Sequence, residues 1–225
     1  MRILNHDMQR FLTYTNFEID IDNEKEDILK KCINRAYRDL SRRIPYKYSL
    51  SMIKNMKKED AKIFNNKKEE FKNSVYELFK ENINSITEPI ELIELIKQKA
   101  DEQDIWTNEK GFTYGLSQKW VNMTLKYLLM FDECPISKEK LDVPVDSYII
   151  KVANASEEKN KLGLDLNYCK SVKWSTWNDI TEYTIFQDKI RKKTEEKNYE
   201  TKIDWEYHAW LEQAICMSSD LYWIT

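Results

Sequence analysis

The scarcity of glycine and proline is the feature that most constrains the fold of this chain. Only three Gly and four Pro occur in 225 residues, well below the usage of ordinary globular domains. A sheet-rich fold needs tight turns at short intervals, and glycine adopts the positive-φ conformations of such turns most easily. We therefore expect an all-α fold, a multi-helix globular domain with few tight turns.

The composition is rich enough in apolar residues to build a sizeable core. Hydrophobic residues make up 41% of the chain, with seven Trp and thirteen Tyr, so a disordered chain is not expected. The length fits residues 1–225 as a single helical domain, or as two lobes, about 1–105 and 106–225, with a cleft between them. The sequence leaves both arrangements open.

Cysteine and histidine usage argues against a metal site. The four cysteines form no CxxC pair, and only two histidines are present, so no metal-ligand spacing exists. These residues are Cys32, Cys134, Cys169, Cys216, His6 and His208. Free thiols in a reducing cytosol are the expected state. Because neither a secretory leader nor an apolar run of about 20 residues is evident, we expect a soluble, cytoplasmic protein without a membrane partner.

Apolar residues recur at helical spacing along most of the chain. One exception is the stretch 11–22, whose end alternates apolar and acidic residues and predicts either a short strand or an extended lead-in. Helices are predicted for residues 22–43, 48–58, 59–83, 85–103, 116–131, 146–156, 174–196 and 203–217. Asp22 or Asn23 is the expected cap of the first of them.

Residues 30–58 concentrate positive charge on a chain whose net charge is −3. They hold ten Lys and Arg against one acid, Asp39, which is a local charge of +9. A basic face on an acidic body suits contact with phosphate. The alternative is a solvated basic face whose charges are offset by acidic neighbours in the fold. The candidate contacts in this stretch are Arg38, Arg42, Arg43 and Lys47.

The segment "GLSQKWVNMTLKYLLMF", residues 115–131, carries a lysine where a helix is about to begin. Lys119 falls in the first turns of the predicted helix, where the aligned peptide dipoles oppose its ammonium charge. That opposition favours the neutral amine, which is the form an amine nucleophile needs. Apolar neighbours such as Trp120 would act in the same direction. The alternative is a lysine whose stem covers the core while its ammonium reaches solvent.

A carboxylate follows 27 residues later, where the next helix is predicted to start. Asp146 comes directly after "VPV" and is a natural N-cap. If the two helices pack across the intervening loop, its carboxylate and the Lys119 amine face one cleft, as a catalytic pair requires. Asp146 could equally be a cap and nothing more.

The residues "GLSQK" (115–119) and "LDVPVDSYIIK" (141–151) together resemble the helix–hairpin–helix DNA glycosylases, especially their 8-oxoguanine branch. That family has a hairpin of the form G-x-G-x-K before a helix, and a later "PVD" that begins another helix. The resemblance spans roughly residues 110–152. It places Gly115 and Ser117 at the two hairpin glycines, Lys119 at the nucleophilic lysine and Asp146 at the catalytic aspartate. The serine at position 117 departs from the family's glycine.

This resemblance implies a base-excision glycosylase and lyase that acts on DNA without a cofactor. The hairpin amides, at Gly115, Ser117 and Gln118, are then expected to bind a DNA phosphate, with the basic stretch adding backbone contacts. Lys119 attacks the sugar, Asp146 stabilises the positive charge on the sugar and helps to activate Lys119, and the base is flipped into an aromatic-walled pocket. The competing hypothesis is a non-enzymatic helical module that binds a protein partner.

Overall fold

The computed structural model describes residues 5–23, 25, 27–107, 111–168 and 173–221. Within these ranges the chain forms helices and no named strand, so the all-α prediction is confirmed. The longer helices are α1 (His6–Phe17), α2 (Ile28–Leu40), α4 (Lys58–Asn82), α5 (Pro89–Asp101), α6 (Tyr114–Met130), α8 (Ile180–Glu196) and α9 (Lys202–Leu221). The short ones are α3 (Leu50–Asn55), α7 (Ser147–Ala153) and the 3-10 turns η1 (Ser41–Arg43), η2 (Lys138–Lys140) and η3 (Trp174–Thr176).

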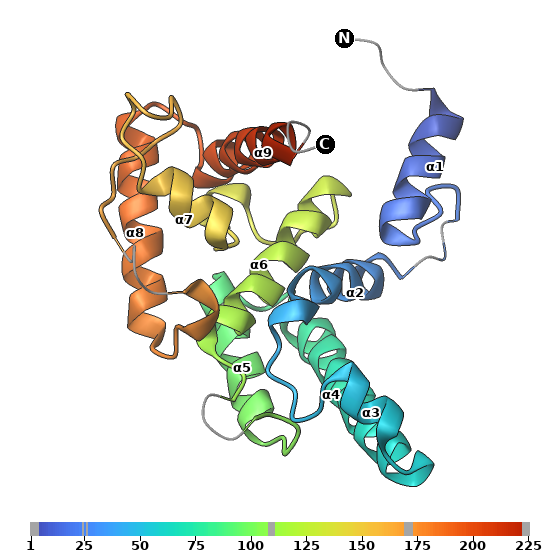
Figure 1. Ribbon diagram of the computed structural model, residues 1–225. Helices are drawn as coiled ribbons and strands as arrows, with labels where there is room; N and C mark the ends of the chain where they lie inside the picture. The colour runs from blue at the N-terminus through green and yellow to red at the C-terminus, as the bar shows by residue number, and fades with distance from the viewer. Residues whose placement is uncertain (1–4, 24, 26, 108–110, 169–172, 222–225) are drawn as a thin grey trace.

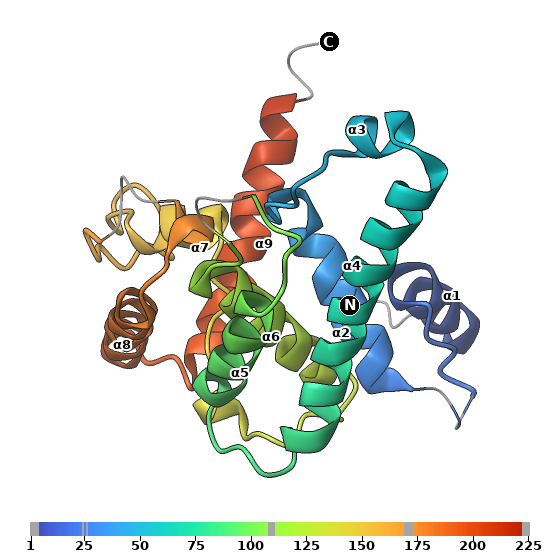
Figure 2. The ribbon, with the colours of Figure 1, turned by 90° about the horizontal axis from the view of Figure 1, so that it is seen from below.

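Helix α6 is the centre of the molecule (Figure 1). It packs against α2 and α5 on one side and against η3 and α8 on the other. Figure 2, seen from below, shows the same order, with α8 at one edge and α4 and α1 at the opposite edge. Nearly every α6 residue from Gly115 to Leu128 is buried, as expected of a helix that is covered on all sides. The predicted central buried helix is therefore confirmed.

The predicted strand at residues 11–22 is wrong. Residues up to Phe17 belong to α1, which Asn5 caps by accepting a hydrogen bond from the Met8 amide at 2.9 Å. Glu18 ends the helix in the left-handed region, with φ of 60°. The apolar alternation after it serves a different purpose, because Ile19 is buried in the core while Phe17 packs on Tyr127.

The first predicted cap is also wrong, since α2 begins four residues later than Asn23 would place it. Asp27 caps the helix, and its Oδ1 accepts the Lys30 amide at 2.9 Å. The buried residues of α2 are Cys32, Ile33, Ala36 and Leu40, and three of them, Cys32, Ala36 and Leu40, recur every four positions. The helix predicted for residues 85–103 is present but begins at Pro89, with Glu88 as its cap and the Glu91 carboxylate accepting the amides of Thr87 and Glu88.

The buried apolar side chains form one cluster that runs from Ile19 to Ala209 and so includes residues of both halves of the chain. A single continuous core is what the one-domain alternative predicts. The division into two lobes with a cleft between them stays a prediction. Among the described residues, no helix combines the length and apolar character that crossing a membrane requires.

An extended segment, residues 141–146, crosses the interior between α6 and α8, and we call it the strap. The strap has no neighbouring strand among the described residues, so its backbone polar groups need other partners. Gln187 of α8 supplies them for Val143, accepting its amide at 3.0 Å and donating to its carbonyl at 2.7 Å. Gln118 of α6 does the same for Val145, at 3.1 and 2.9 Å. Two buried glutamine side chains thus make the hydrogen bonds that the backbone of a neighbouring strand would otherwise provide.

Replacing Gln187 by methionine tests this clamp. Methionine keeps the length of the side chain but leaves the Val143 N–H and C=O buried without partners. Each such loss costs about 1–3 kcal/mol, so the free energy of unfolding in urea should fall by roughly 2–5 kcal/mol. Gln103→Met is the control, because that half-buried side chain makes one long bond, 3.4 Å to the Lys99 carbonyl. Equal losses in the two variants would contradict the clamp.

Candidate active site

The start of α6 is enclosed by η3 and the residue that follows it. Thr113 caps the helix, accepting the Leu116 amide at 3.2 Å and donating its hydroxyl to the Ser175 carbonyl at 2.9 Å. The Gly115 amide donates to the Trp177 carbonyl at 3.0 Å. A Cβ added at Gly115 would lie 1.9 Å from the Trp174 carbonyl oxygen, so glycine is present because another backbone crosses the helix here.

The expectation of a hairpin at residues 115–119 is therefore wrong. Gly115 and Ser117 lie inside the first turn of α6, and both are buried. Gln118, predicted to contact DNA, is fully buried and holds the strap instead. The Ser117 amide donates to Thr113, and the Ser117 hydroxyl has no hydrogen-bond partner among the described residues. A phosphate contact at these three residues would require α6 to separate from η3 and the strap.

Lys119 and Asp146 meet, as the sequence predicted. The Lys119 Nζ donates to the Asp146 Oδ2 at 2.9 Å, and the side chains are only 7% and 18% exposed. The reason is the clamp beside them: Gln118 binds Val145, so the residues that follow each of these two positions are brought face to face. Asp146 is also the N-cap of α7, because its Oδ1 accepts the amides of Tyr148 and Ile149 at 2.9 and 3.0 Å.

An aromatic pair borders this ion pair. Trp210 of α9 donates its indole N–H to the Asp146 Oδ2 at 3.2 Å. Its ring lies 5.8 Å from that of Tyr148, tilted by 40°, and Trp210 remains 39% exposed. Sequence reasoning missed this contact, because Trp210 and Asp146 are 64 residues apart and no local pattern links them. The aromatic pair therefore forms the outer boundary of the site.

The electrostatics of the site keep Asp146 ionised. Burial alone raises its pKa, but the Lys119 ammonium, the Ile149 amide and the Trp210 indole outweigh this and hold the pKa below the ordinary value. A second buried pair lies nearby, between the Lys126 Nζ and the Glu206 Oε2 at 2.5 Å. For Glu206, burial prevails over the attraction of Lys126 and raises the pKa.

The basic residues divide into paired and exposed ones. Arg38 forms an ion pair with Glu18 at 2.5 Å, and Lys47 forms one with Asp104. Arg42 and Arg43 are exposed on η1. The alternative weighed for this stretch, charges offset by acidic neighbours, thus describes Arg38 and Lys47. The exposed arginines keep the phosphate-binding prediction open.

Other chemistry predicted from the sequence is limited. The Cys32 thiol is buried, and burial with the nearby Glu133 charge raises its pKa to about 12. Cys169 lies outside the described residues. Within the described part of the chain, no three His, Cys, Asp or Glu side chains are arranged to hold a metal ion. Sequence reasoning also missed Asp142 of the strap, whose carboxylate binds the buried side chains of Lys202 and Tyr183.

Comparisons with known proteins find no matching family model, no similar curated protein and no similar solved structure.

Gly115→Ala tests the close packing of η3 on α6. In an ordinary helix interior this change stabilises by about 1 kcal/mol. Here the new methyl group would overlap the Trp174 carbonyl, so we expect destabilisation of roughly 1–3 kcal/mol, measured by urea unfolding. Ser117→Ala, in the same turn, removes an unpartnered hydroxyl and should cost nothing. A Gly115→Ala protein more stable than the parent would contradict the packing.

Asp146→Asn tests the charge of the ion pair. Because the folded-state pKa of Asp146 is lowered, its ionisation stabilises the fold above the unfolded pKa of about 3.9 and stops doing so as pH falls through the folded pKa. The difference in unfolding free energy between wild type and Asp146→Asn should be largest near neutral pH and shrink below about pH 4. Asparagine still caps α7, so a double-mutant cycle with Lys119→Met isolates the charge pair. A pH-independent difference would contradict the lowered pKa.

Proposed function

We propose that this protein is a DNA base-excision enzyme of the glycosylase and lyase type, with Lys119 as the nucleophile and Asp146 as its electrostatic partner. The observation that carries the proposal is the 2.9 Å contact between the Lys119 Nζ and the Asp146 Oδ2. An amine near the start of one helix and the N-cap aspartate of a later helix meet in the order that the resemblance to helix–hairpin–helix glycosylases implies. Helix α5 precedes the lysine and packs against α6, the helix that carries it.

The proposed reaction begins when Lys119 leaves the ion pair and loses its proton. The neutral amine attacks the sugar C1′, the C1′–N bond breaks, and the base departs with the bonding electrons and gains a proton. The sugar ring opens to give an iminium link to Lys119, from which the strand can be cleaved by elimination. No metal or organic cofactor takes part in this sequence.

Asp146 is suited to one of two conceivable roles. A carboxylate whose pKa is held low is a weak base, so it is a poor acceptor for the Lys119 proton. It stays ionised near neutral pH and can stabilise positive charge as that charge develops on the sugar. We therefore assign Asp146 the electrostatic role and propose that water accepts the Lys119 proton.

Access to the lysine depends on α9. With 7% of its side chain exposed, the amine must become more accessible before it reacts, and we assign this step to movement of Trp210, which is hydrogen-bonded to Asp146. The aromatic pair of Trp210 and Tyr148 would then provide the wall against which a flipped base can stack. DNA backbone contacts are assigned to the exposed Arg42 and Arg43.

Borohydride trapping tests the chemistry directly. Reduction of the iminium with DNA that carries an abasic or oxidised site should give a covalent adduct with the wild-type protein. Lys119→Gln should give none, and Asp146→Asn should form it about 10²–10³-fold more slowly. Lys138→Gln, which removes another partly buried, ion-paired lysine, is the control and should react normally. An adduct with Lys119→Gln would mean that another amine is the nucleophile.

Salt dependence tests the DNA contacts. Replacing Arg42 and Arg43 together by alanine should weaken binding and reduce the slope of log K against log salt by up to about two units. Lys192→Ala with Lys193→Ala, a change of two adjacent cations on α8, is the matched control and should leave the slope unchanged. Equal slopes for both double variants would place the phosphate contacts elsewhere.

A second candidate function is a helical module that binds a protein partner without catalysis. It is favoured by α1, none of whose residues is buried. The helix leaves large apolar side chains exposed, namely Met8, Phe11, Leu12 and Tyr14. Failure of the wild-type protein to form an adduct on abasic and oxidised DNA alike would make this candidate the better one.

A further inference from the structure

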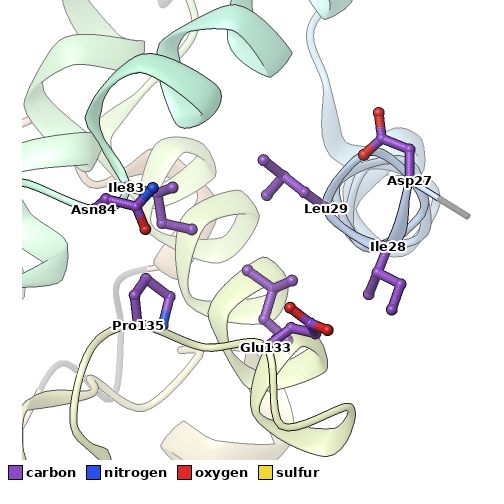
Figure 3. A pocket seen from close by; sticks show the side chains of 8 residues that line it. Asp27, Ile28, Leu29, Ile83, Asn84, Glu133 and Pro135 are labelled. Atoms are coloured by element: carbon purple, nitrogen blue, oxygen red, sulfur yellow. The ribbon is translucent and has the colours of Figure 1, made fainter. Parts of the chain in front are cut away.

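A cavity of about 290 Å³ opens between the first turn of α2, the end of α4 and the loop after α6 (Figure 3). It has no lining residue in common with the candidate active site. The residues around it are Asp27, Ile28, Leu29, Ile83, Asn84, Leu128, Glu133 and Pro135. In the close view, Leu29 points across the opening toward Asn84 and Ile83, and the Glu133 carboxylate extends toward α2.

The cavity floor is apolar. Ile83 and Leu128 are buried, and Leu29 is half-buried beside them. The volume is at the low end of the range for ligand pockets, about 300–1,000 Å³. A site of this size with an apolar floor is suited to a single long side chain, whose methylene groups would cover the floor.

The rim is negatively charged. The Asp27 carboxylate is held in place by the Lys30 amide and by the Tyr76 hydroxyl, at 2.9 and 2.7 Å. Glu133 is exposed at the opposite wall, and its charge is close enough to the buried Cys32 to help raise the pKa of that thiol. The cavity lining includes no Lys or Arg. Lys30 and Lys80 lie over the ring of Tyr76, whose hydroxyl binds Asp27, so Glu133 is the carboxylate with the smaller share of nearby positive charge among the described residues.

The helix ends around the cavity add to the negative charge of its surroundings. Helix α4 ends at Asn82 and α6 at Met130, so both present their C-terminal ends near it. Each such end carries roughly half a negative charge. The opposing N-terminal end of α2 carries roughly half a positive charge, which offsets part of the charge of its Asp27 cap. Glu133, the remaining charge of Asp27 and the two helix C-termini therefore favour a cation.

We propose that this cavity binds an arginine side chain presented by a partner protein. The guanidinium is planar and offers five N–H donors, which the Glu133 carboxylate and the Asn84 carbonyl oxygen can accept together. Its three methylene groups match the apolar floor. A partner can reach the site, because Asn84, Glu133 and Pro135 are exposed. This inference is independent of the proposed catalytic function.

Binding of N-acetyl-arginine amide, followed by NMR shifts of the Ile83 and Leu128 methyl groups, tests the proposal. We expect saturable binding in the millimolar range, a Glu133→Gln variant at least five-fold weaker, and at least ten-fold weaker binding of the citrulline analogue, which lacks the charge. Glu70→Gln, a change of an exposed glutamate on α4 outside the cavity, should bind like wild type. Asp27→Asn retains a capping side chain and should also weaken binding, whereas Asp179→Asn, at the cap of α8, should not.

Three results would overturn the assignment. They are the absence of a saturable shift at these methyl groups, citrulline binding as strong as that of arginine, and equal affinities of the Glu133→Gln and Glu70→Gln variants. A fourth result, binding of the N-acetyl-lysine amide as tight as that of the arginine amide, would overturn the assignment of a guanidinium. It would indicate a site for alkyl cations in general. None of these variants removes a side chain from the candidate active site, so a loss of binding is separable from a loss of catalysis.

Discussion

Backbone that crosses a protein interior must find hydrogen-bond partners, and the strap meets this requirement with two glutamine side chains. Gln118 and Gln187 each bind both polar groups of one strap residue, Val145 and Val143. Because the glutamines come from α6 and α8, the strap also fixes how these helices lie relative to each other. The cost of an unpaired buried amide or carbonyl, about 1–3 kcal/mol each, makes this arrangement specific.

The candidate active site is a consequence of that clamp. Lys119 follows Gln118 in α6, and Asp146 follows Val145 in the strap, so the hydrogen bonds of one pair bring the next pair together. Burying a lysine and an aspartate costs free energy that their attraction repays only with good geometry and further hydrogen bonds. Here Asp146 gains two amides of α7 and the Trp210 indole. The ion pair is thus compatible with a structural role, and it also places the Lys119 amine beside a carboxylate, as the proposed chemistry requires.

Sequence periodicity predicted the helices well because each helix is defined by local spacing. The stripe of α2, the start of α5 at Pro89 and the buried α6 all follow from apolar residues three or four positions apart and from capping chemistry. The strand predicted before α2 failed because a short alternation does not distinguish a strand from the end of a helix followed by one buried residue, Ile19. The hairpin at Gly115 failed for a similar reason, since a glycine can serve close packing as well as a turn.

The sequence by itself determined the helical class of this protein, most helix positions and the order of Lys119 and Asp146 along the chain. These depend on composition and on contacts within about four residues. Only the tertiary structure decided that Gln118 faces the strap, that Trp210 reaches Asp146, and that Arg38 and Lys47 have acidic partners while Arg42 and Arg43 are exposed. Each of the contacts joins residues at least 20 positions apart, and the choice among such partners depends on how the whole chain packs.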